Sequence, residues 1–165
     1  MRLKFRTFSW IIPAVLITSL AGATGMDLHR MWDNRCLECH GHSGAFARQF
    51  LSVSSGQLQG RHHTDNLHRF LSSHYLSDSE VDAIYSMLLA QASTPAKFEN
   101  ECSKCHETAA IFVRQSLEFQ NGVLFGRASG QRVSEFLRHH RTLSPDDVEF
   151  FENLLRRIAT EIYRP

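Results

Sequence analysis

The sequence Cys36-Leu37-Glu38-Cys39-His40 decides how this chain folds, and its pattern returns as Cys102-Ser103-Lys104-Cys105-His106. In both stretches two residues separate a pair of cysteines, and a histidine follows the second cysteine directly. On a helical turn this spacing places both thiols on one side, with the imidazole next to them. The chain contains four cysteines and these stretches use them all, so no thiol is left over as a catalytic nucleophile.

The pattern Cys-x-x-Cys-His is the attachment signature of a c-type haem. Each thiol adds to one vinyl group of the same porphyrin, and the histidine supplies an imidazole nitrogen as the proximal ligand of the iron. We therefore predict two covalently bound haem c groups. The residues that hold them are Cys36, Cys39, His40, Cys102, Cys105 and His106. A zinc site and a pair of disulfides remain as alternatives, but neither explains the repeated histidine.

Residues 1–23 have the pattern of a secretory signal peptide. Three cations lie within the first six residues, residues 8–20 are mostly apolar, and Ala21-Gly22-Ala23 has the form of a cleavage site. The apolar run is shorter than the roughly 20 residues that a membrane-spanning helix needs. We expect a periplasmic protein, which agrees with haem attachment outside the cytoplasm; an uncleaved N-terminal anchor is the alternative.

The net charge of the chain is small. It is +1 at pH 7, and removal of residues 1–23 takes three of the 18 lysines and arginines, which leaves 15 against 17 acids, or −2. Nothing in this balance is basic enough to suggest a nucleic-acid-binding surface. We expect no nucleic-acid partner, and contact with a membrane only through a partner protein or an uncleaved anchor.

The chain contains one pattern twice, at an offset of 66 residues. Beyond the cysteine stretches, the matching pairs are Phe46/Phe112, Arg48/Arg114, Gln49/Gln115, Gly60/Gly126, Arg61/Arg127, Phe70/Phe136, Leu71/Leu137 and His74/His140. After the last pair the second copy has one extra residue. Pro95 interrupts the helical pattern between the copies, so we expect haem domains at residues 24–93 and 94–165.

We predict an all-α fold in which two small helical domains each surround one haem. The last helix of each copy has the clearest signal, because Ser77 and Ser144 begin capping patterns and apolar residues follow at helical spacing. The other expected segments are helices at about 44–52 and 107–119 and loops around 56–60 and 122–130. Since a domain of about 70 residues rarely buries enough apolar surface alone, we expect the haem to be part of each core.

Each copy resembles the small soluble (class I) cytochromes c. Trp32 and Phe98 stand four residues before the first cysteine, as in that family. The stretch Leu124–Gly130 is similar to the family's Leu-x-Gly-Arg-x-x-Gly loop, and 58–61 is its first-copy counterpart. Each final helix begins with Leu-Ser-x-x-x-Val. The tandem arrangement resembles dihaem cytochromes c.

The resemblance implies further site residues. Arg61 and Arg127 would lie near a haem propionate, since the guanidinium fork suits a carboxylate. Class I proteins usually supply a methionine as sixth ligand, but the second copy has none after its cysteine stretch. Its only later histidines are His139 and His140, and of these only His140 has a repeat counterpart, His74. The expected iron ligands are therefore His40, His74, His106 and His140.

Some details of the ligation stay open. Each second histidine can serve its own half or the other one, and His62 or His63 is the reserve candidate for an axial ligand. Met87 lies inside the last helix of the first copy, so we expect it in the core.

Two imidazoles on one iron leave no open position for a substrate, which favours an electron carrier over an enzyme. The expected partners are redox proteins: a quinol oxidase or dehydrogenase on one side and a terminal reductase or oxidase on the other. One alternative is a haem enzyme or a binder of peroxide, nitric oxide or oxygen with one open iron site. Another is a non-shuttling haem subunit of a larger respiratory or photosynthetic complex.

Overall fold

The computed structural model describes residues 25–61 and 67–164. The expected signal peptide lies outside the described residues, and so do His62 and His63. Among the residues that are described, no helix is both long enough and apolar enough to cross a membrane.

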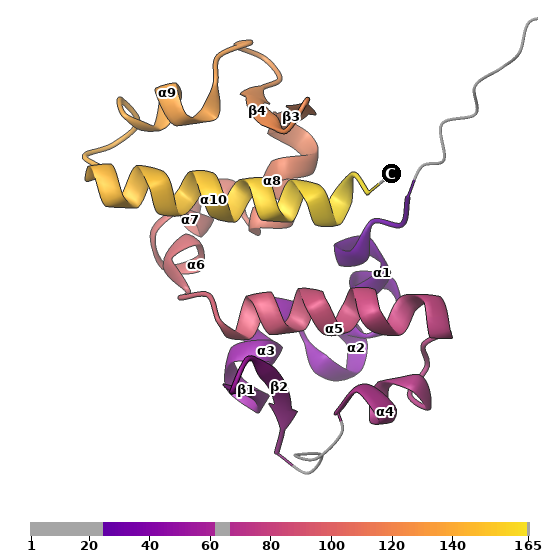
Figure 1. Ribbon diagram of the computed structural model, residues 1–165. Helices are drawn as coiled ribbons and strands as arrows, with labels where there is room; N and C mark the ends of the chain where they lie inside the picture. The colour runs from indigo at the N-terminus through magenta and orange to yellow at the C-terminus, as the bar shows by residue number, and fades with distance from the viewer. Residues whose placement is uncertain (1–24, 62–66, 165) are drawn as a thin grey trace, which may run out of the picture.

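The two halves of the chain have the same order of elements: three helices, a two-stranded hairpin and two further helices (Figure 1). The first half contains α1 (Leu28–Arg35), α2 (Leu37–His40), α3 (Ser43–Phe50), β1 (Leu51–Ser54), β2 (Gln57–Gly60), α4 (Leu67–Ser72) and α5 (Asp78–Ala92). The second half contains α6 (Lys97–Glu101), α7 (Ser103–His106), α8 (Ala109–Ser116), β3 (Leu117–Gln120), β4 (Val123–Gly126), α9 (Val133–Leu137) and α10 (Pro145–Ile162).

The prediction of an all-α fold is wrong, because each half contains an antiparallel hairpin and the fold is mixed. β1 pairs with β2, and β3 pairs with β4, in the same register. Ser55 and Gly56 lie between the first two strands, and Asn121 and Gly122 between the other two. All four have a positive φ, between 49° and 80°, as the central residues of a type I′ turn require. The strands replace the ends of the predicted helices and part of the predicted loops.

The final helices confirm the prediction made for them. Ser77 and Glu80 form a complete capping box at the start of α5, and Ser144 and Asp147 form one at the start of α10. These side chains satisfy backbone N–H groups that have no partner inside the helix, which fixes where each helix begins.

A hydrophobic cluster fills each half. In the first half, Ile84 and Leu88 of α5 belong to the same cluster as Trp32 of α1. In the second half, Phe151 of α10 belongs to a cluster with Val113 of α8. Each such side chain contributes about 1.5–3 kcal/mol when it is fully buried. The final helix of each half is therefore central to its core: α5 contacts α1, α3, α4 and both strands of the first hairpin, and α10 contacts α8 and α9.

Ion pairs join the halves through repeated positions. Arg48 of α3 lies 2.6 Å from Glu99 of α6. Its repeat counterpart Arg114 of α8 lies 3.9 Å from Asp33 of α1, and Asp33 and Glu99 are themselves 66 residues apart. Each half thus presents the same arginine to the same acidic position of the other half, which is the arrangement of a two-fold interface.

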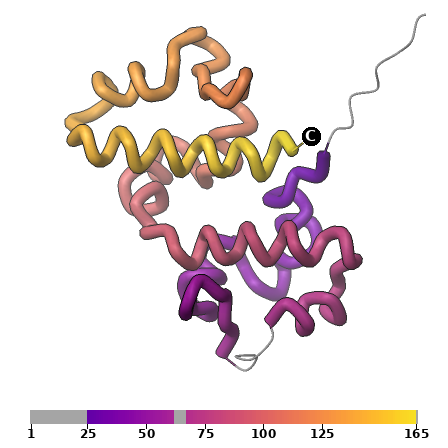
Figure 2. Tube along the Cα trace, viewed as in Figure 1, coloured from indigo at the N-terminus to yellow at the C-terminus, as the bar shows by residue number. Residues whose placement is uncertain are grey.

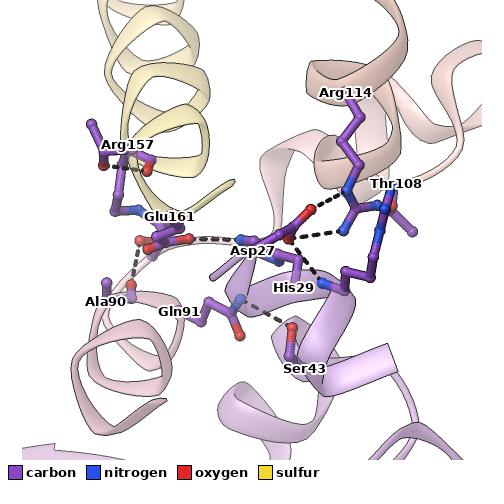
Figure 3. Close-up of polar contacts among 12 residues, drawn as sticks. Asp27, His29, Ser43, Ala90, Gln91, Thr108, Arg114, Arg157 and Glu161 are labelled. Carbon is purple, nitrogen blue, oxygen red and sulfur yellow. Dashed lines mark hydrogen bonds and ion pairs between the residues drawn. The ribbon is translucent and has the colours of Figure 1, made fainter. Parts of the chain in front are cut away.

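Other contacts between the halves have no counterpart (Figure 3). Arg114 Nε lies 2.7 Å from the carboxylate of Asp27. His29 Nε2 lies 2.7 Å from the carboxylate of Glu161, and both side chains are buried. The two ends of the described chain are joined by a backbone hydrogen bond of 2.9 Å, and Figure 2 shows the C-terminus next to the first described residues. The N-terminal segment thus packs against the second half.

Candidate functional site

Each Cys-x-x-Cys-His stretch forms a helical turn directly after a helix. The Cys36 N–H donates to the Trp32 carbonyl at 2.8 Å, and the His40 N–H donates to the Cys36 carbonyl at 2.9 Å. The same two bonds recur in the second half at 2.8 and 3.0 Å. The two cysteines and the histidine of each stretch therefore belong to one turn, and all four thiols are free.

Two pairs of histidines face each other, one pair in each half. The ring centroids of His40 and His74 are 5.9 Å apart, with an angle of 66° between the ring planes. Those of His106 and His140 are 6.1 Å apart, with an angle of 56°. The structure thus brings together the four predicted ligands as two pairs, each formed within one half and not exchanged between halves. That they bind iron stays a prediction.

The separation within each pair suits two imidazoles on one metal ion. Metal–nitrogen bonds of about 2 Å place two opposite ligand nitrogens about 4 Å apart, and the ring centroids about 6 Å apart once each ring's radius is added. Both observed separations agree with this value. The spacing of the rings therefore suits His40 with His74, and His106 with His140, as the residues that would hold an iron ion.

Phenylalanine rings support both members of each pair. Phe46 meets the ring of His40 edge-on at 4.7 Å, and Phe70 stacks on His74 at 4.7 Å. The corresponding contacts in the second half, from Phe112 and Phe136, measure 4.5 and 4.8 Å. The sequence prediction did not assign these four rings to the site. Their signal was present, because both pairs of phenylalanines match in the repeat.

The electrostatics of the site favour neutral imidazoles. Burial lowers the pKa of His40, and the neighbouring His74 lowers it further. Burial and then the neighbouring His140 lower the pKa of His106 in the same way. A neutral imidazole has the free nitrogen lone pair that a metal ion requires. Burial also raises the pKa of the first thiol in each stretch.

A cavity of about 680 Å³ lies in the second half, lined by both of its cysteines and both of its paired histidines. The other lining residues include Phe98 of α6, Leu117 of β3, and Phe151 and Leu155 of α10. The volume lies within the roughly 300–1,000 Å³ that is usual for sites of compact organic ligands. Thiols, facing imidazoles and apolar walls in one cavity together fit a porphyrin.

The two arginines that the resemblance places near haem propionates have other partners in the structure. The guanidinium of Arg61 lies 5.9 Å from the ring centroid of Phe50. Arg127 donates a hydrogen bond of 2.8 Å to the Leu117 carbonyl. The cations that line the cavity include Arg141. A contact of Arg61 or Arg127 with a propionate stays a prediction.

Other described histidines lie away from these pairs. His29 is bonded to Glu161, and His68 lies 2.7 Å from Asp82 at the surface. Met87 is 1% exposed and belongs to the core, as predicted. Within residues 25–61 and 67–164, no three or more His, Cys, Asp or Glu side chains converge as a ready-made metal site.

No family model, curated protein or solved structure matches this chain. What the site can do therefore follows from its own chemistry: two thiols on one turn and two facing imidazoles in each half.

Proposed function

We propose that this chain is an exported dihaem c-type cytochrome that carries single electrons between redox proteins. The observation that carries the proposal is the facing pair of imidazoles in each half, with centroids 5.9 and 6.1 Å apart. One such pair can arise by chance. The two pairs lie at repeated positions, each includes the histidine of a Cys-x-x-Cys-His turn, and each is supported by two phenylalanines. This repetition indicates that both pairs bind the same kind of ligand.

The cysteines would attach the haems. In each attachment the S–H group adds across one vinyl group, so that a carbon–sulfur bond forms and the thiol hydrogen moves to the other vinyl carbon. No electron is gained or lost overall. Cys36 and Cys39 serve the first half, and Cys102 and Cys105 serve the second. Because both bonds of one haem start from a single helical turn, the attachment keeps each group in its own half.

The histidines would bind the iron from both sides. His40 and His106 belong to the attachment turns, while His74 and His140 follow α4 and α9 and face them. With imidazole on both sides, no coordination position is left for a substrate, and this favours electron transfer over catalysis. When bound, each haem would accept and release one electron. The apolar walls of the cavity would exclude water from its surroundings.

We place the protein in the periplasm, on the signal-like pattern of residues 1–23 and on the site of haem attachment in bacteria. A carrier of this kind needs a donor and an acceptor. A quinol oxidase or dehydrogenase would supply electrons, and a terminal reductase or oxidase would receive them. The low net charge of the chain gives no reason to expect a nucleic-acid partner.

The test is the purified full-length protein, produced in cells with a haem c maturation system. We expect a mass increased by two haems, low-spin spectra in both oxidation states, and no response of the reduced protein to carbon monoxide. A mass without two added macrocycles would overturn the assignment of the cofactor. A Soret shift with carbon monoxide would instead reveal an open iron site, and a ligand-binding or catalytic role would replace electron transfer.

A further inference from the structure

An arginine joins the turn that carries the second histidine to the cysteine stretch, and it does so in both halves. In the first half, Arg35 Nη2 donates to the Tyr75 carbonyl. In the second half, Arg141 Nη1 donates to the Glu101 carbonyl. Arg35 and Glu101 directly precede the first cysteine, and Tyr75 and Arg141 directly follow the second histidine. The same two points of the fold are therefore connected twice.

The direction of this bond is reversed between the halves. The first half supplies the arginine from the cysteine side and the carbonyl from the histidine side, and the second half does the opposite. In both halves the acceptor is a backbone oxygen. The halves exchange donor and acceptor, yet both join the residue before the first cysteine to the residue after the second histidine. This repetition indicates that the fold requires a bond between these two points, whichever side supplies the arginine.

The backbone at the residue after the second histidine is held by fewer contacts than the histidine itself, whose N–H donates to the Leu71 carbonyl at 3.1 Å in the first half and to the Leu137 carbonyl at 3.3 Å in the second. Tyr75 and Arg141 have φ angles of 58° and 66°, in a region that residues other than glycine rarely adopt. The preceding helices are short, with six residues in α4 and five in α9. The side chain of Tyr75 is 82% exposed, so packing of this residue does not fix the turn.

We infer that Arg35 and Arg141 are positioning residues that keep His74 and His140 facing the proximal histidines. The inference rests on the proposed function, because it concerns the second iron ligand. Phe70 and Phe136 stack on these histidines, and the arginine bond adds a second restraint on the backbone directly after each of them. This bond limits movement of the histidine without touching the ligand itself.

The halves divide this task differently. Arg35 also forms an ion pair of 2.6 Å with Glu80, the capping acid of α5. In the second half the capping acid Asp147 is paired with Lys97, and Arg141 holds the turn. Loss of Arg35 therefore removes two connections, whereas loss of Arg141 removes one.

The test is carbon monoxide binding by the reduced, full-length dihaem protein. Arg35→Gln and Arg141→Gln should each make carbon monoxide binding detectable at one haem, because loss of a hydrogen bond from a charged donor raises the equilibrium constant for release of the second histidine about tenfold. The increase should be larger for Arg35→Gln. Arg30→Gln, which changes an exposed arginine of the same helix, is the matched control and should behave like the wild type. Lys97→Gln breaks only the ion pair with Asp147 of α10, and this variant should also fail to bind carbon monoxide.

Two further measurements make the result independent of a single variant. Arg35→Lys keeps the charge but not the two-pronged geometry, so its response should lie between wild type and Arg35→Gln. Hydrogen exchange of the backbone at 72–76 should become faster in Arg35→Gln and stay unchanged in the control.

The outcomes separate this inference from the proposed function. If wild type and both glutamine variants are equally inert to carbon monoxide, the inference is wrong and the proposed function stands. The inference gives the arginines a role only in positioning the second histidine. It is therefore also wrong if the glutamine variants lose covalent haem while the control retains it. A wild type that lacks haem or binds carbon monoxide contradicts the proposed function itself.

Discussion

Arg114 of α8 holds the carboxylate of Asp27 with two bonds: Nε lies 2.7 Å from Oδ2, and Nη2 lies 3.3 Å from Oδ1. The two residues are 87 positions apart and belong to different halves, so this ion pair bridges them (Figure 3). Asp27 also caps α1 by accepting the Arg30 N–H at 2.9 Å. Its carboxylate thus connects the start of the first half to the second.

The bridge makes stability depend on pH. Burial alone would raise the pKa of Asp27, but bonds from Arg114 and the Arg30 amide outweigh it and hold the pKa below 3.8. The carboxylate therefore stabilises the fold above about pH 4, and this contribution is lost as the pH falls through the lowered pKa. Asp27→Asn keeps the helix cap and should lower the free energy of unfolding by about 1 kcal/mol at neutral pH. Urea unfolding from about pH 7 to pH 3 should show this difference shrink; a constant difference would contradict it.

His29 and Glu161 form a second bridge, with side chains that are 8% and 11% exposed. Replacing His29 by leucine leaves the buried carboxylate with Arg157, which lies 2.7 Å away. We expect His29→Leu to lower the free energy of unfolding by about 2 kcal/mol, because the buried Glu161 carboxylate loses one of its hydrogen bonds. The double variant His29→Leu/Glu161→Leu should recover part of this loss in the same unfolding assay. Strictly additive effects of the two single changes would show that the pair is not coupled.

The ion pair of Lys97 and Asp147 can be tested by titration. Hydrogen bonds from Lys97 and then from Ser144 lower the pKa of Asp147 to about 2. Carbon-detected NMR of this carboxyl group should give that midpoint, and Lys97→Met should move it up toward 3.8. Because the pKa is lowered, Asp147 stabilises the fold above about pH 4 and loses this effect as the pH falls toward 2. Arg156→Gln, at an exposed position of α10, should leave the midpoint unchanged.

Neighbouring histidines provide a matched test of iron ligation. His140 faces His106, whereas His139 is exposed. On the proposed function, His140→Ala should turn one of the two haems into a high-spin form that binds carbon monoxide. His139→Ala should leave the absorption and electron paramagnetic resonance spectra as they are in the wild type. Spectra that respond to His139→Ala and not to His140→Ala would reverse the assignment.

The final helices could be predicted because their signals are local: a capping serine followed by apolar residues at helical spacing. The hairpins had a local signal too, since Asn121-Gly122 is a strong type I′ sequence. In the first copy the same turn is Ser55-Gly56, which is a weaker signal. The apolar residues around both turns also suit a helix when they are considered without pairing partners, and for this reason the strands were missed.

The paired histidines could be found from the repeat, because both copies keep them at the same distance from the cysteines. The arginine connections could not. Arg35 and Arg141 occupy different positions in the two copies, so a comparison of the copies shows no match there. The contact between His29 and Glu161 joins residues 132 positions apart. No pattern in the sequence around either residue predicts that the two would meet.

Two ion pairs between the halves involve equivalent residues: Arg48 pairs with Glu99, and Arg114 pairs with Asp33. In each pair one half supplies the arginine and the other half supplies the acid. A self-pairing ancestor whose gene was duplicated and fused would leave this mark. Once both copies belong to one chain, dilution no longer separates them. The interface residues of one copy can then be substituted without the two copies coming apart. The unequal contacts of Asp27 and His29 are the kind of divergence that such a fusion permits.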